Sequence, residues 1–295
     1  MKLGRAVAIG FAGGAVGAAL LARRGGRGRV YIPLPPGRVA TALITGASSG
    51  IGAEFARQLA AGGYTPILVA RRQERLEEVA DNLAQRYGIQ SQILAADLSE
   101  DAGVAAVVER IRELGDLTVL VNNAGFGTKG RLANADPEKQ AAMVRLHALA
   151  TMQLTQAALP GMIERRRGAI INVSSVAAFI RRPGAVNYCA TKAYINAFCE
   201  GLAQELRGTG VQVQALCPGL THTEFHNSPE YASKTGKPPT KRGPEFIWLS
   251  AEKVVRDSLT ALEHDRVICI PGLTYQILAG VVRTPFIGPV LARRA

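Results

Sequence analysis

The fold of this chain is decided by one stretch, residues 39–60, which reads VATALITGASSGIGAEFARQLA. Its first six residues are apolar except for Thr41 and suit a short buried strand. A turn follows that contains three glycines, Gly46, Gly50 and Gly52, and residues 53–60 then have the pattern of a helix. A strand, a glycine-rich turn and a helix, in that order, begin a dinucleotide-binding fold.

The glycine turn is suited to binding phosphate. Glycines allow the backbone to approach a pyrophosphate closely, and the helix N-terminus offers unpaired N–H groups at the positive end of its dipole. The spacing is TGxxxGxG rather than GxGxxG, and no Gly-Lys-Ser/Thr follows, so the turn is not a P-loop. We expect the cofactor phosphates to be bound by Gly46, Ser48, Ser49, Gly50, Ile51 and Gly52.

A second pattern supplies acid–base chemistry. Tyr188 and Lys192 lie four residues apart, on one face of a predicted helix. A phenol with a pKa of about 10 exchanges protons poorly at neutral pH, and a nearby ammonium favours the phenolate and lowers that pKa. Tyr188 is therefore a candidate general acid and base. Ser175, upstream, is a hydroxyl that could bond to the same substrate oxygen.

The glycine turn also fits a different class of enzyme. Residues 46–50, GASSG, match the G-x-S-x-G turn of hydrolases, with Ser48 as the nucleophile. The histidines that could serve as its base are His222, His226 and His264. This alternative leaves Tyr188 and Lys192 unexplained. The turn also follows the first strong strand, so no earlier strand supplies the second oxyanion donor.

Six ordered motifs carry a family resemblance. They are Thr45-Gly46-Ala47-Ser48-Ser49-Gly50-Ile51-Gly52, Asp97-Leu98, Asn122-Asn123-Ala124-Gly125, Ile171-Asn172-Val173-Ser174-Ser175, Tyr188-Cys189-Ala190-Thr191-Lys192 and Pro218-Gly219-Leu220-Thr221-His222-Thr223. In these motifs the chain resembles the short-chain dehydrogenase/reductase family, over roughly residues 38 to 271. The resemblance implies an oxidoreductase that interconverts a carbonyl and an alcohol, with Tyr188 as the acid and base.

The resemblance also implies roles for further residues. Asp97 and Leu98 would border the adenine, and Lys192 would bind the nicotinamide-ribose hydroxyls. The cofactor cleft would be lined by Asn123, Ala124 and Gly125, and its nicotinamide end held by Pro218, Gly219 and Thr223. With Ser175, Tyr188 and Lys192 the family usually has a catalytic Asn, which holds a water for a proton relay. His147 matches that position, and an imidazole can also bond to water, so we treat His147 as a candidate relay residue.

The rest of the pattern predicts one α/β domain. Strand-like runs at 66–69, 92–94, 117–121, 169–173, 211–216 and 266–270 alternate with helical patterns at 72–86, 100–114, 137–159 and 187–207. Such alternation predicts a single Rossmann-like, doubly wound parallel sheet with helices on both faces. We divide the chain into an apolar, basic N-terminal segment (1–30), a catalytic domain (31–272) and an apolar C-terminal segment (273–295).

The choice of cofactor is predicted at the end of the second strand. NAD enzymes place an acid there against the ribose 2′-hydroxyl. This chain has Ala70, followed by Arg71 and Arg72. Arg71 could pair with a 2′-phosphate through charge-assisted hydrogen bonds, so we expect NADP(H) in preference to NAD(H). The alternative is that both arginines only begin a solvated helix.

The net charge of +12 gathers at the two ends of the chain. Residues 1–30 contain basic residues and no acid, around an uncharged apolar run at 6–22. This run is near the lower limit for a spanning helix, about 17–25 residues, and the arginines that follow it disfavour a cleaved signal peptide. We treat residues 1–30 as a candidate membrane anchor with the catalytic domain on the cytoplasmic side; the alternative is a flexible tail.

The remaining features of the sequence indicate which kinds of partner and substrate to expect. Because the charge lies on apolar tails and not on a folded face, we expect no nucleic-acid partner. The cysteines form no C-x-x-C pair, and their spacing with histidine offers no metal site.

We expect a homodimer or homotetramer acting on a lipophilic small molecule. The turn-rich stretch 231–239 is a candidate lid over the substrate. A non-catalytic cofactor-binding protein is a further alternative.

Overall fold

A parallel sheet forms the centre of the protein, as the sequence predicted. The computed structural model describes residues 40–128, 130–227 and 244–283. Seven strands lie in the order β3-β2-β1-β4-β5-β6-β9, and every neighbouring pair is parallel. The strands are β1 (Ala40–Thr45), β2 (Tyr64–Ala70), β3 (Gln92–Ala95), β4 (Leu117–Asn122), β5 (Gly168–Val173), β6 (Val211–Leu216) and β9 (Ile268–Cys269).

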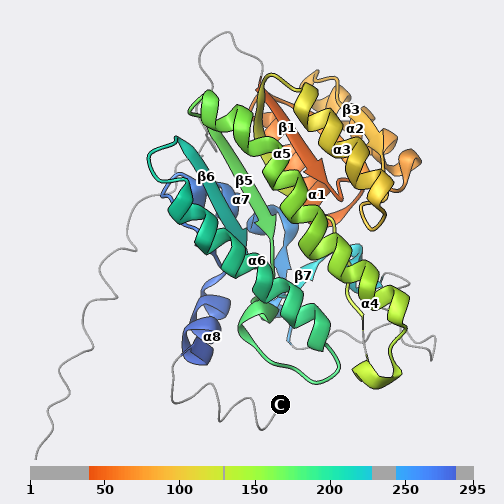
Figure 1. Cartoon of the computed structure of the whole chain (residues 1–295), viewed down its shortest axis with the longest axis vertical. Coiled ribbons are helices and arrows are strands. Elements are labelled where there is room, and N and C mark those ends of the chain that lie inside the picture. The colour runs from red at the N-terminus through yellow and green to blue at the C-terminus, as the bar shows by residue number, and fades with distance from the viewer. Residues whose placement is uncertain (1–39, 129, 228–243, 284–295) are drawn as a thin grey trace, which may run out of the picture.

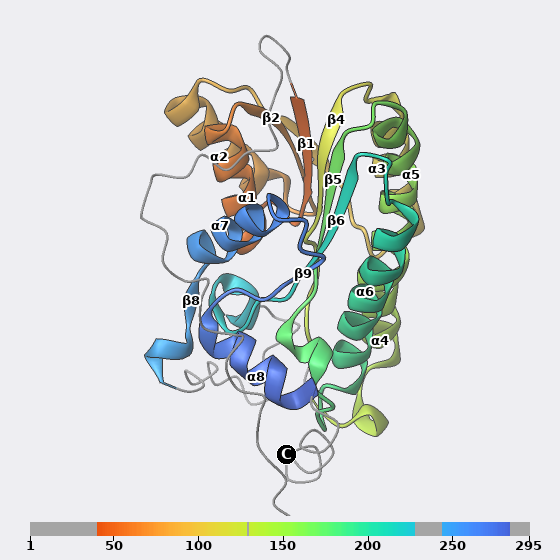
Figure 2. The same cartoon turned by 90° about the vertical axis from the view of Figure 1, so that its left-hand side faces the viewer.

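Helices cover both faces of this sheet, which gives three layers (Figures 1 and 2). One face is covered by α1 (Gly50–Ala61), α2 (Gln73–Tyr87) and α7 (Ala251–Leu262). The other is covered by α3 (Asp101–Glu113), α4 (Pro137–Val144), α5 (Thr151–Glu164) and α6 (Val186–Glu205). The doubly wound Rossmann-like prediction is thereby confirmed.

Two buried apolar clusters, one on each face, hold the layers together. Leu68, Val119 and Ile171 point toward α1, α2 and α7, where they meet side chains such as Phe55. The alternate residues of the same strands, such as Leu120, point toward α3, α5 and α6. Because successive side chains of a strand alternate between faces, a strand buried on both faces is largely apolar along its length.

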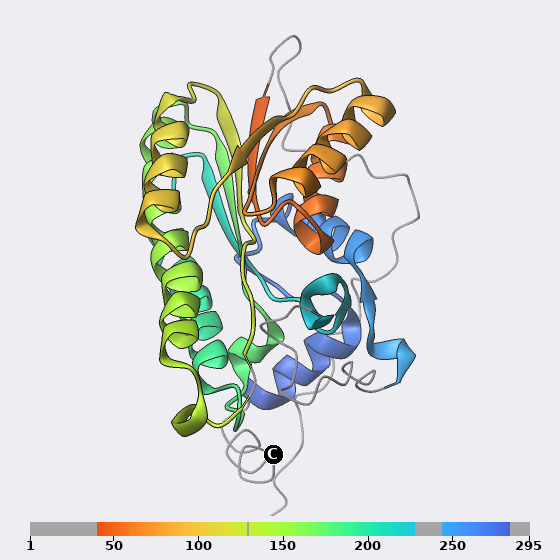
Figure 3. The same ribbon diagram turned by 90° about the vertical axis from the view of Figure 1, so that its right-hand side faces the viewer.

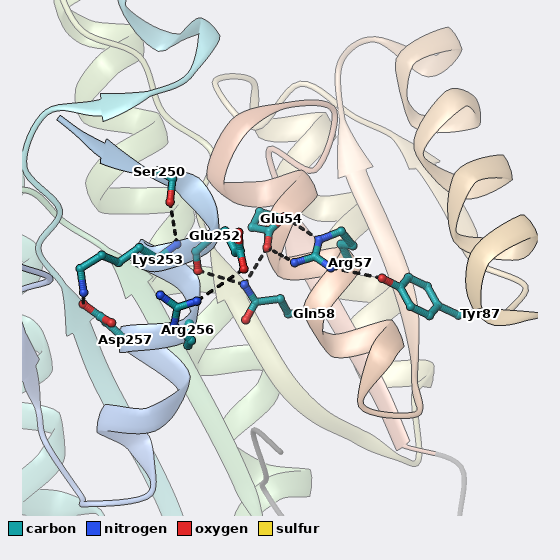
Figure 4. A network of polar contacts seen from close by, with 9 residues as sticks. All are labelled: Glu54, Arg57, Gln58, Tyr87, Ser250, Glu252, Lys253, Arg256 and Asp257. Atoms are coloured by element: carbon teal, nitrogen blue, oxygen red, sulfur yellow. Dashed lines mark hydrogen bonds and ion pairs between the residues drawn. The ribbon is translucent and has the colours of Figure 1, made fainter. Parts of the chain in front are cut away.

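Helix α1 carries the glycine turn at its N-terminus, and polar contacts fix it between its neighbours (Figure 4). Arg57 bonds to Glu54 within α1, and its Nη1 donates to the hydroxyl of Tyr87 in α2 at 3.2 Å. On the other side Gln58 Nε2 donates to the carbonyl oxygen of Glu252 in α7 at 3.1 Å. These bonds tie α1 to α2 on one side and to α7 on the other, so they hold the turn in place at the end of β1.

The segment 137–159 was predicted as one regular helix, and it contains a π-helical turn. Asp136 caps α4 by accepting bonds from the N–H groups of Glu138 and Lys139. A π-helix, Arg145–Ala150, then joins α4 to α5 without a break. The π-turn contains His147, and it turns the buried face of the segment between α4 and α5.

Short elements and α8 (Leu273–Arg283) cover the carboxyl end of the sheet (Figures 2 and 3). They include the 3₁₀ turns η3 (Val176–Phe179), η4 (Glu224–Asn227) and η5 (Glu245–Ile247), and the two-stranded pair β7 (Thr221–His222) and β8 (Leu249–Ser250). The remaining 3₁₀ turn, η1 (Leu132–Asn134), precedes α4. Helix α8 buries Tyr275 and Ala279 against the domain and exposes the apolar side chains of Leu273, Ile277 and Leu278.

Three segments singled out in the sequence lie wholly or partly outside the described residues. They are the candidate anchor, 1–30, the candidate lid, 231–239, and the end of the chain beyond α8. Among the helices that the structure does describe, none has the length and apolar character needed to cross a bilayer.

Candidate active site

The site forms where the connections of β1 and β4 diverge to opposite faces of the sheet. β1 leads into α1 on one face, and the chain after β4 leads into α4 on the other. Ligands of open parallel sheets bind at such switch points, outside the carboxyl ends of the strands. The glycine turn after β1 and the Asn123–Gly125 loop after β4 therefore lie side by side.

The glycine turn has a conformation and a density of packing that only glycine permits. Gly46 and Gly50 have φ values of +65° and +57°, in the left-handed region. A Cβ on Gly52 would lie 2.2 Å from the carbonyl oxygen of Gly46. Ser49 is the N-cap of α1 but makes no side-chain cap bond, which leaves the first-turn N–H groups to a phosphate. The turn therefore fits a dinucleotide.

Thr45 and Asn123 fasten this turn to the neighbouring loop. Thr45 Oγ1 accepts bonds from the N–H groups of Asn123 and Ala124, at 2.9 and 3.0 Å. In return Asn123 Nδ2 donates to the carbonyl oxygens of Thr45 and Gly46, at 2.9 and 3.2 Å. The sequence assigned Asn123 to the cofactor cleft; its side chain holds two of the cleft's walls together.

The catalytic candidates lie on the opposite wall, at the end of β5 and along α6. Lys192 is 4% exposed, and its Nζ donates to the carbonyl oxygen of Val173 at 2.8 Å. Burial lowers the pKa of Lys192 from 10.5 to about 7. Nζ lies 5.8 Å from the centre of the Tyr188 ring, so the predicted pairing of the phenol with a cation has a structural basis.

Ser175 is held at the mouth of the same wall. It is the N-cap of η3, where its Oγ accepts a bond of 3.1 Å from the N–H of Ala177. A hydroxyl that accepts one bond still has its own proton to donate. Ser175 therefore keeps a proton to donate, and it lines the same cavity as Tyr188.

One cavity of about 750 Å³ joins these walls. The predicted site residues on its surface are Gly46, Ser49, Gly50, Ile51, Asn123, Ala124, Gly125, Ser175, Tyr188, Lys192, Pro218, Gly219 and Thr223. The cavity also has an apolar part that sequence reasoning missed, formed by Ile180, Leu220, Phe225, Ile247, Tyr275 and Leu278. Gly52 is not among the lining residues, because it packs beneath the turn.

The apolar part is fixed by Tyr275 of α8. A Cβ on Gly219 would lie 2.0 Å from the Tyr275 ring, so the glycine permits the ring to pack on the backbone. The Tyr275 hydroxyl accepts a bond from the N–H of Leu220 and donates to the carbonyl oxygen of Ile247. Tyr275 thus joins the chain after β6 to the chain before β8.

A second cavity of about 480 Å³ lies at the adenosine end, lined by Gly46, Ser48, Ala70, Arg71, Arg72, Asp97 and Leu98 among others. Arg72 Nη2 donates to Ser48 Oγ at 3.2 Å and lies 3.4 Å from a carboxylate oxygen of Glu224. Arg71 Nη1 lies 3.8 Å from Asp97 Oδ2. Both arginines therefore line this cavity, Arg72 beside the glycine turn and Arg71 beside Asp97, whereas the sequence singled out Arg71.

The comparisons with known proteins agree with this geometry. Residues 40–232 match the family model described as short chain dehydrogenase. The chain belongs to the short-chain dehydrogenase/reductase family. It is 32% identical to a very-long-chain 3-oxoacyl-CoA reductase of Anas platyrhynchos over 240 residues, which cover 76% of this chain and 75% of that protein.

Solved structures of the family share the fold. A short-chain dehydrogenase from Sphingobium yanoikuyae in complex with NADPH is 33% identical, with a TM-score of 0.73 over 82% of this chain and 93% of that one. A bulky-bulky ketone specific alcohol dehydrogenase from Comamonas testosteroni is 30% identical, with a TM-score of 0.71 over 82% of this chain and 91% of that one. The chain is thus an oxidoreductase of a family that uses nicotinamide cofactors.

Membership of this family argues against the hydrolase alternative. The partners of His222 and His264 agree with that conclusion, since neither histidine is shown bonded to Ser48. Ser48 has the Arg72 guanidinium as its polar neighbour. His222 stacks on Trp248 and pairs with Glu245, and His264 bonds to the carbonyl oxygen of Thr260. The side chain of His226 lies outside the described residues.

His147, the candidate relay residue, is buried behind the cavity wall and does not line the cavity itself. Its ring is edge-on to Tyr188, with 5.9 Å between the ring centres and 72° between the planes. A Cβ on Gly125 would lie 2.8 Å from His147 Nε2, so the imidazole packs directly behind the cofactor loop. The imidazole therefore lies close to both the Tyr188 ring and the loop after β4.

Proposed function

We propose that the protein is an NADPH-dependent reductase of ketones whose carbonyl is flanked by long or bulky apolar groups. The observation that carries this proposal is the single cavity of about 750 Å³, because the glycine turn and the three catalytic candidates, Ser175, Tyr188 and Lys192, line it together. A nucleotide on one wall and a carbonyl on the other would meet within this cavity.

The chemistry requires a hydride and a proton. A bound NADPH would supply the hydride to the carbonyl carbon. Tyr188 donates its phenolic proton to the carbonyl oxygen, so the carbonyl becomes an alcohol and Tyr188 becomes a phenolate. Ser175 donates a hydrogen bond to the same oxygen and stabilises the negative charge that develops there.

Lys192 assists by its charge. The ammonium favours the phenolate that remains on Tyr188 after proton donation. Because burial brings the pKa of Lys192 to about 7, this residue changes between its charged and neutral forms near neutral pH. The charged form of Lys192 predominates below that pKa. Low pH also favours reduction, because the reaction consumes a proton.

The preference for NADPH rests on Arg71 and Arg72. Two guanidinium groups line the adenosine end of the cleft, and both form solvent-exposed ion pairs, Arg71 with Asp97 and Arg72 with Glu224. A 2′-phosphate can accept charge-assisted hydrogen bonds from both. The relative from Sphingobium yanoikuyae, which was solved in complex with NADPH, supports this choice.

The substrate class rests on the apolar part of the cavity. Ile180, Phe225, Ile247 and Leu278 line the same cavity as Tyr188 and make part of its wall apolar. Such a surface favours burial of alkyl or ring carbon. The names of two relatives, a very-long-chain 3-oxoacyl-CoA reductase and a bulky-bulky ketone specific alcohol dehydrogenase, fit the same class.

We also propose that the protein works at the cytoplasmic face of a membrane as a homodimer or homotetramer. The apolar, basic segment 1–30 would provide the attachment. The exposed apolar side chains of Leu273, Ile277 and Leu278 on α8 support it, because Leu278 also lines the cavity in which a lipophilic substrate would bind.

A substrate panel tests the proposed function. The panel contains a 3-oxoacyl thioester with a long chain, the same thioester with a short chain, and a small ketone. We expect NADPH consumption with the long thioester, an alcohol product by mass spectrometry, and a kcat/KM that is higher than that for the small ketone by at least about tenfold. A small ketone that is reduced as well as the long thioester would contradict the proposed substrate class.

A further inference from the structure

The imidazole of His147 is fully enclosed and engaged at both of its nitrogens. Only 1% of the residue is exposed. Nε2 accepts a bond of 3.2 Å from the backbone N–H of Phe126, in the loop after β4. Nδ1 lies 3.0 Å from Oγ1 of Thr191, and that hydroxyl donates to the carbonyl oxygen of Tyr188, also at 3.0 Å.

These bonds determine the protonation of the ring. A backbone N–H can only donate, so Nε2 must be unprotonated. The hydroxyl of Thr191 has one proton and donates it to the Tyr188 carbonyl, so Nδ1 must carry a proton and donate it to Thr191. The arrangement therefore requires a neutral imidazole protonated at Nδ1.

We propose that His147 is a neutral positioning residue that joins the cofactor loop at Phe126 to the helical turn of Tyr188 and Thr191, and that its ring does not pass the proton. This role differs from the relay role that the sequence suggested. A relay through the ring would need a nitrogen free for water or substrate, and both nitrogens already bond to protein groups.

The groups around the ring favour the neutral form. The titratable side chains that face it, Lys192 and Tyr188, both come from α6, and Phe126 packs on another side. Burial and the positive charge of Lys192 hold the pKa of His147 well below its usual value. A second positive charge beside the Lys192 ammonium would be costly, so the imidazole stays neutral at this position.

The π-turn and Gly125 complete the arrangement. The π-turn, Arg145–Ala150, carries the imidazole, which bonds to Phe126 on one side and to Thr191 on the other. Gly125 leaves room for it, since a Cβ there would lie 2.8 Å from Nε2 and 3.7 Å from Lys192 Nζ. A movement of the loop after β4 would therefore be transmitted through one rigid ring to the backbone that carries Tyr188.

The first test is independent of the enzyme's activity. Histidine labelled with ¹⁵N is incorporated into the full chain, and the resonances of His147 are assigned by their loss in His147→Asn. We expect a neutral ring protonated at Nδ1 at every pH from about 5.5 to 8.5, with and without NADPH. A ring protonated at Nε2, or one that titrates within this range, overturns the proposal even if the protein proves to have another substrate.

The second test separates the two arms of the ring and rests on the proposed reduction. The amide of Asn ends near the position of Nδ1 and can still donate to Thr191, whereas the longer Gln reaches the position of Nε2 and can still accept from Phe126. We expect His147→Asn to weaken NADPH binding about five- to tenfold with kcat within about threefold. We expect His147→Gln to lower kcat about tenfold with NADPH affinity nearly unchanged.

Thr191→Val provides the matched control. It has the shape of threonine without the hydroxyl, so it breaks the bond from His147 to the Tyr188 backbone and leaves Phe126 untouched. Its kinetics should match those of His147→Gln. If both His147 variants instead lose kcat with an altered pH profile and unchanged NADPH affinity, the ring relays protons and the positioning role is wrong. If the wild-type protein reduces no ketone but the NMR result holds, the proposed function fails and the positioning role survives.

Discussion

Lys192 Nζ donates a hydrogen bond of 2.8 Å to the carbonyl oxygen of Val173. This bond ties the middle of α6 to the last residue of β5, and it holds the cation 5.8 Å from the centre of the Tyr188 ring. The side chain is buried, so its charge is disfavoured and its pKa falls to about 7. The site therefore contains a lysine that destabilises the folded protein whenever it is charged.

A dependence of stability on pH follows. Between the lowered pKa of Lys192, about 7, and its ordinary value of 10.5, the unfolded chain binds a proton that the native protein does not. The free energy of unfolding should therefore rise with pH across this window, by up to about 1.4 kcal/mol per pH unit from this residue. Lys192→Met should remove that part of the slope.

Urea unfolding at pH values from about 7 to 9.5 measures this slope for the wild type and the variant. Lys253→Met is the matched control, because Lys253 is an exposed lysine paired with Asp257 and should leave the slope unchanged. Equal slopes for the wild type and Lys192→Met would mean that Lys192 keeps its charge in the native protein.

The two arginines at the adenosine end should determine cofactor choice. Arg71→Ala and Arg72→Ala should each weaken NADPH binding about ten- to a hundredfold, because each removes a charge-assisted bond to the 2′-phosphate. NADH has no such phosphate, so its affinity should change little. Arg75→Ala, one turn further along α2 and paired with Glu78, controls for the loss of positive charge. Equal losses for NADPH and NADH would show that neither arginine binds the phosphate.

The glycine turn should tolerate no side chain at Gly52. A Cβ there would lie 2.2 Å from the Gly46 carbonyl oxygen and 2.5 Å from Asn123 Nδ2, so Gly52→Ala must displace the turn. We expect NADPH quenching of protein fluorescence to be lost and the midpoint of thermal unfolding to fall. Gly201→Ala, in α6 with no atom near the added Cβ, should leave both unchanged or raise the midpoint. A Gly52→Ala protein that binds NADPH normally would contradict the role of the turn.

Membrane attachment should depend on residues 1–30. The full chain should sediment with membranes in low and high salt, whereas a chain that starts at Val30 should not. Release of the full chain by high salt alone would indicate attachment through the arginines without insertion. Equal solubility of the two chains would show that residues 1–30 are a tail with no part in attachment.

Much of the fold and of the site followed from local sequence. The turn at Gly46–Gly52 could be predicted because its flanking strand and helix have clear patterns. Ser175, Tyr188 and Lys192 line one cavity because all three follow β5 at the carboxyl end of the sheet, Ser175 at the start of η3 and the other two in the first turns of α6. Helix α7 could also have been found, since Ser250 is a good N-cap before apolar residues spaced for a helix.

Other parts of the site depend on contacts that local sequence does not encode. The π-turn at His147 has no signal in a pattern of period 3.6, so the segment appeared as one regular helix. The apolar part of the cavity needs Tyr275 of α8 to pack on Gly219, a contact between residues far apart in the chain. The approach of Arg72 to Ser48 likewise depends on how β2 pairs with β1.

The most direct test of the central claim, that Tyr188 protonates a ketone during NADPH-dependent reduction, is the turnover of Tyr188→Phe. NADPH consumption is followed with the best substrate of the panel, and NADPH affinity is measured by fluorescence on the same samples. We expect turnover to fall by at least about a hundredfold while the NADPH affinity stays within about twofold, because only the proton donor is lost. A variant that keeps most of the wild-type rate would contradict the assignment of Tyr188 and the mechanism built on it.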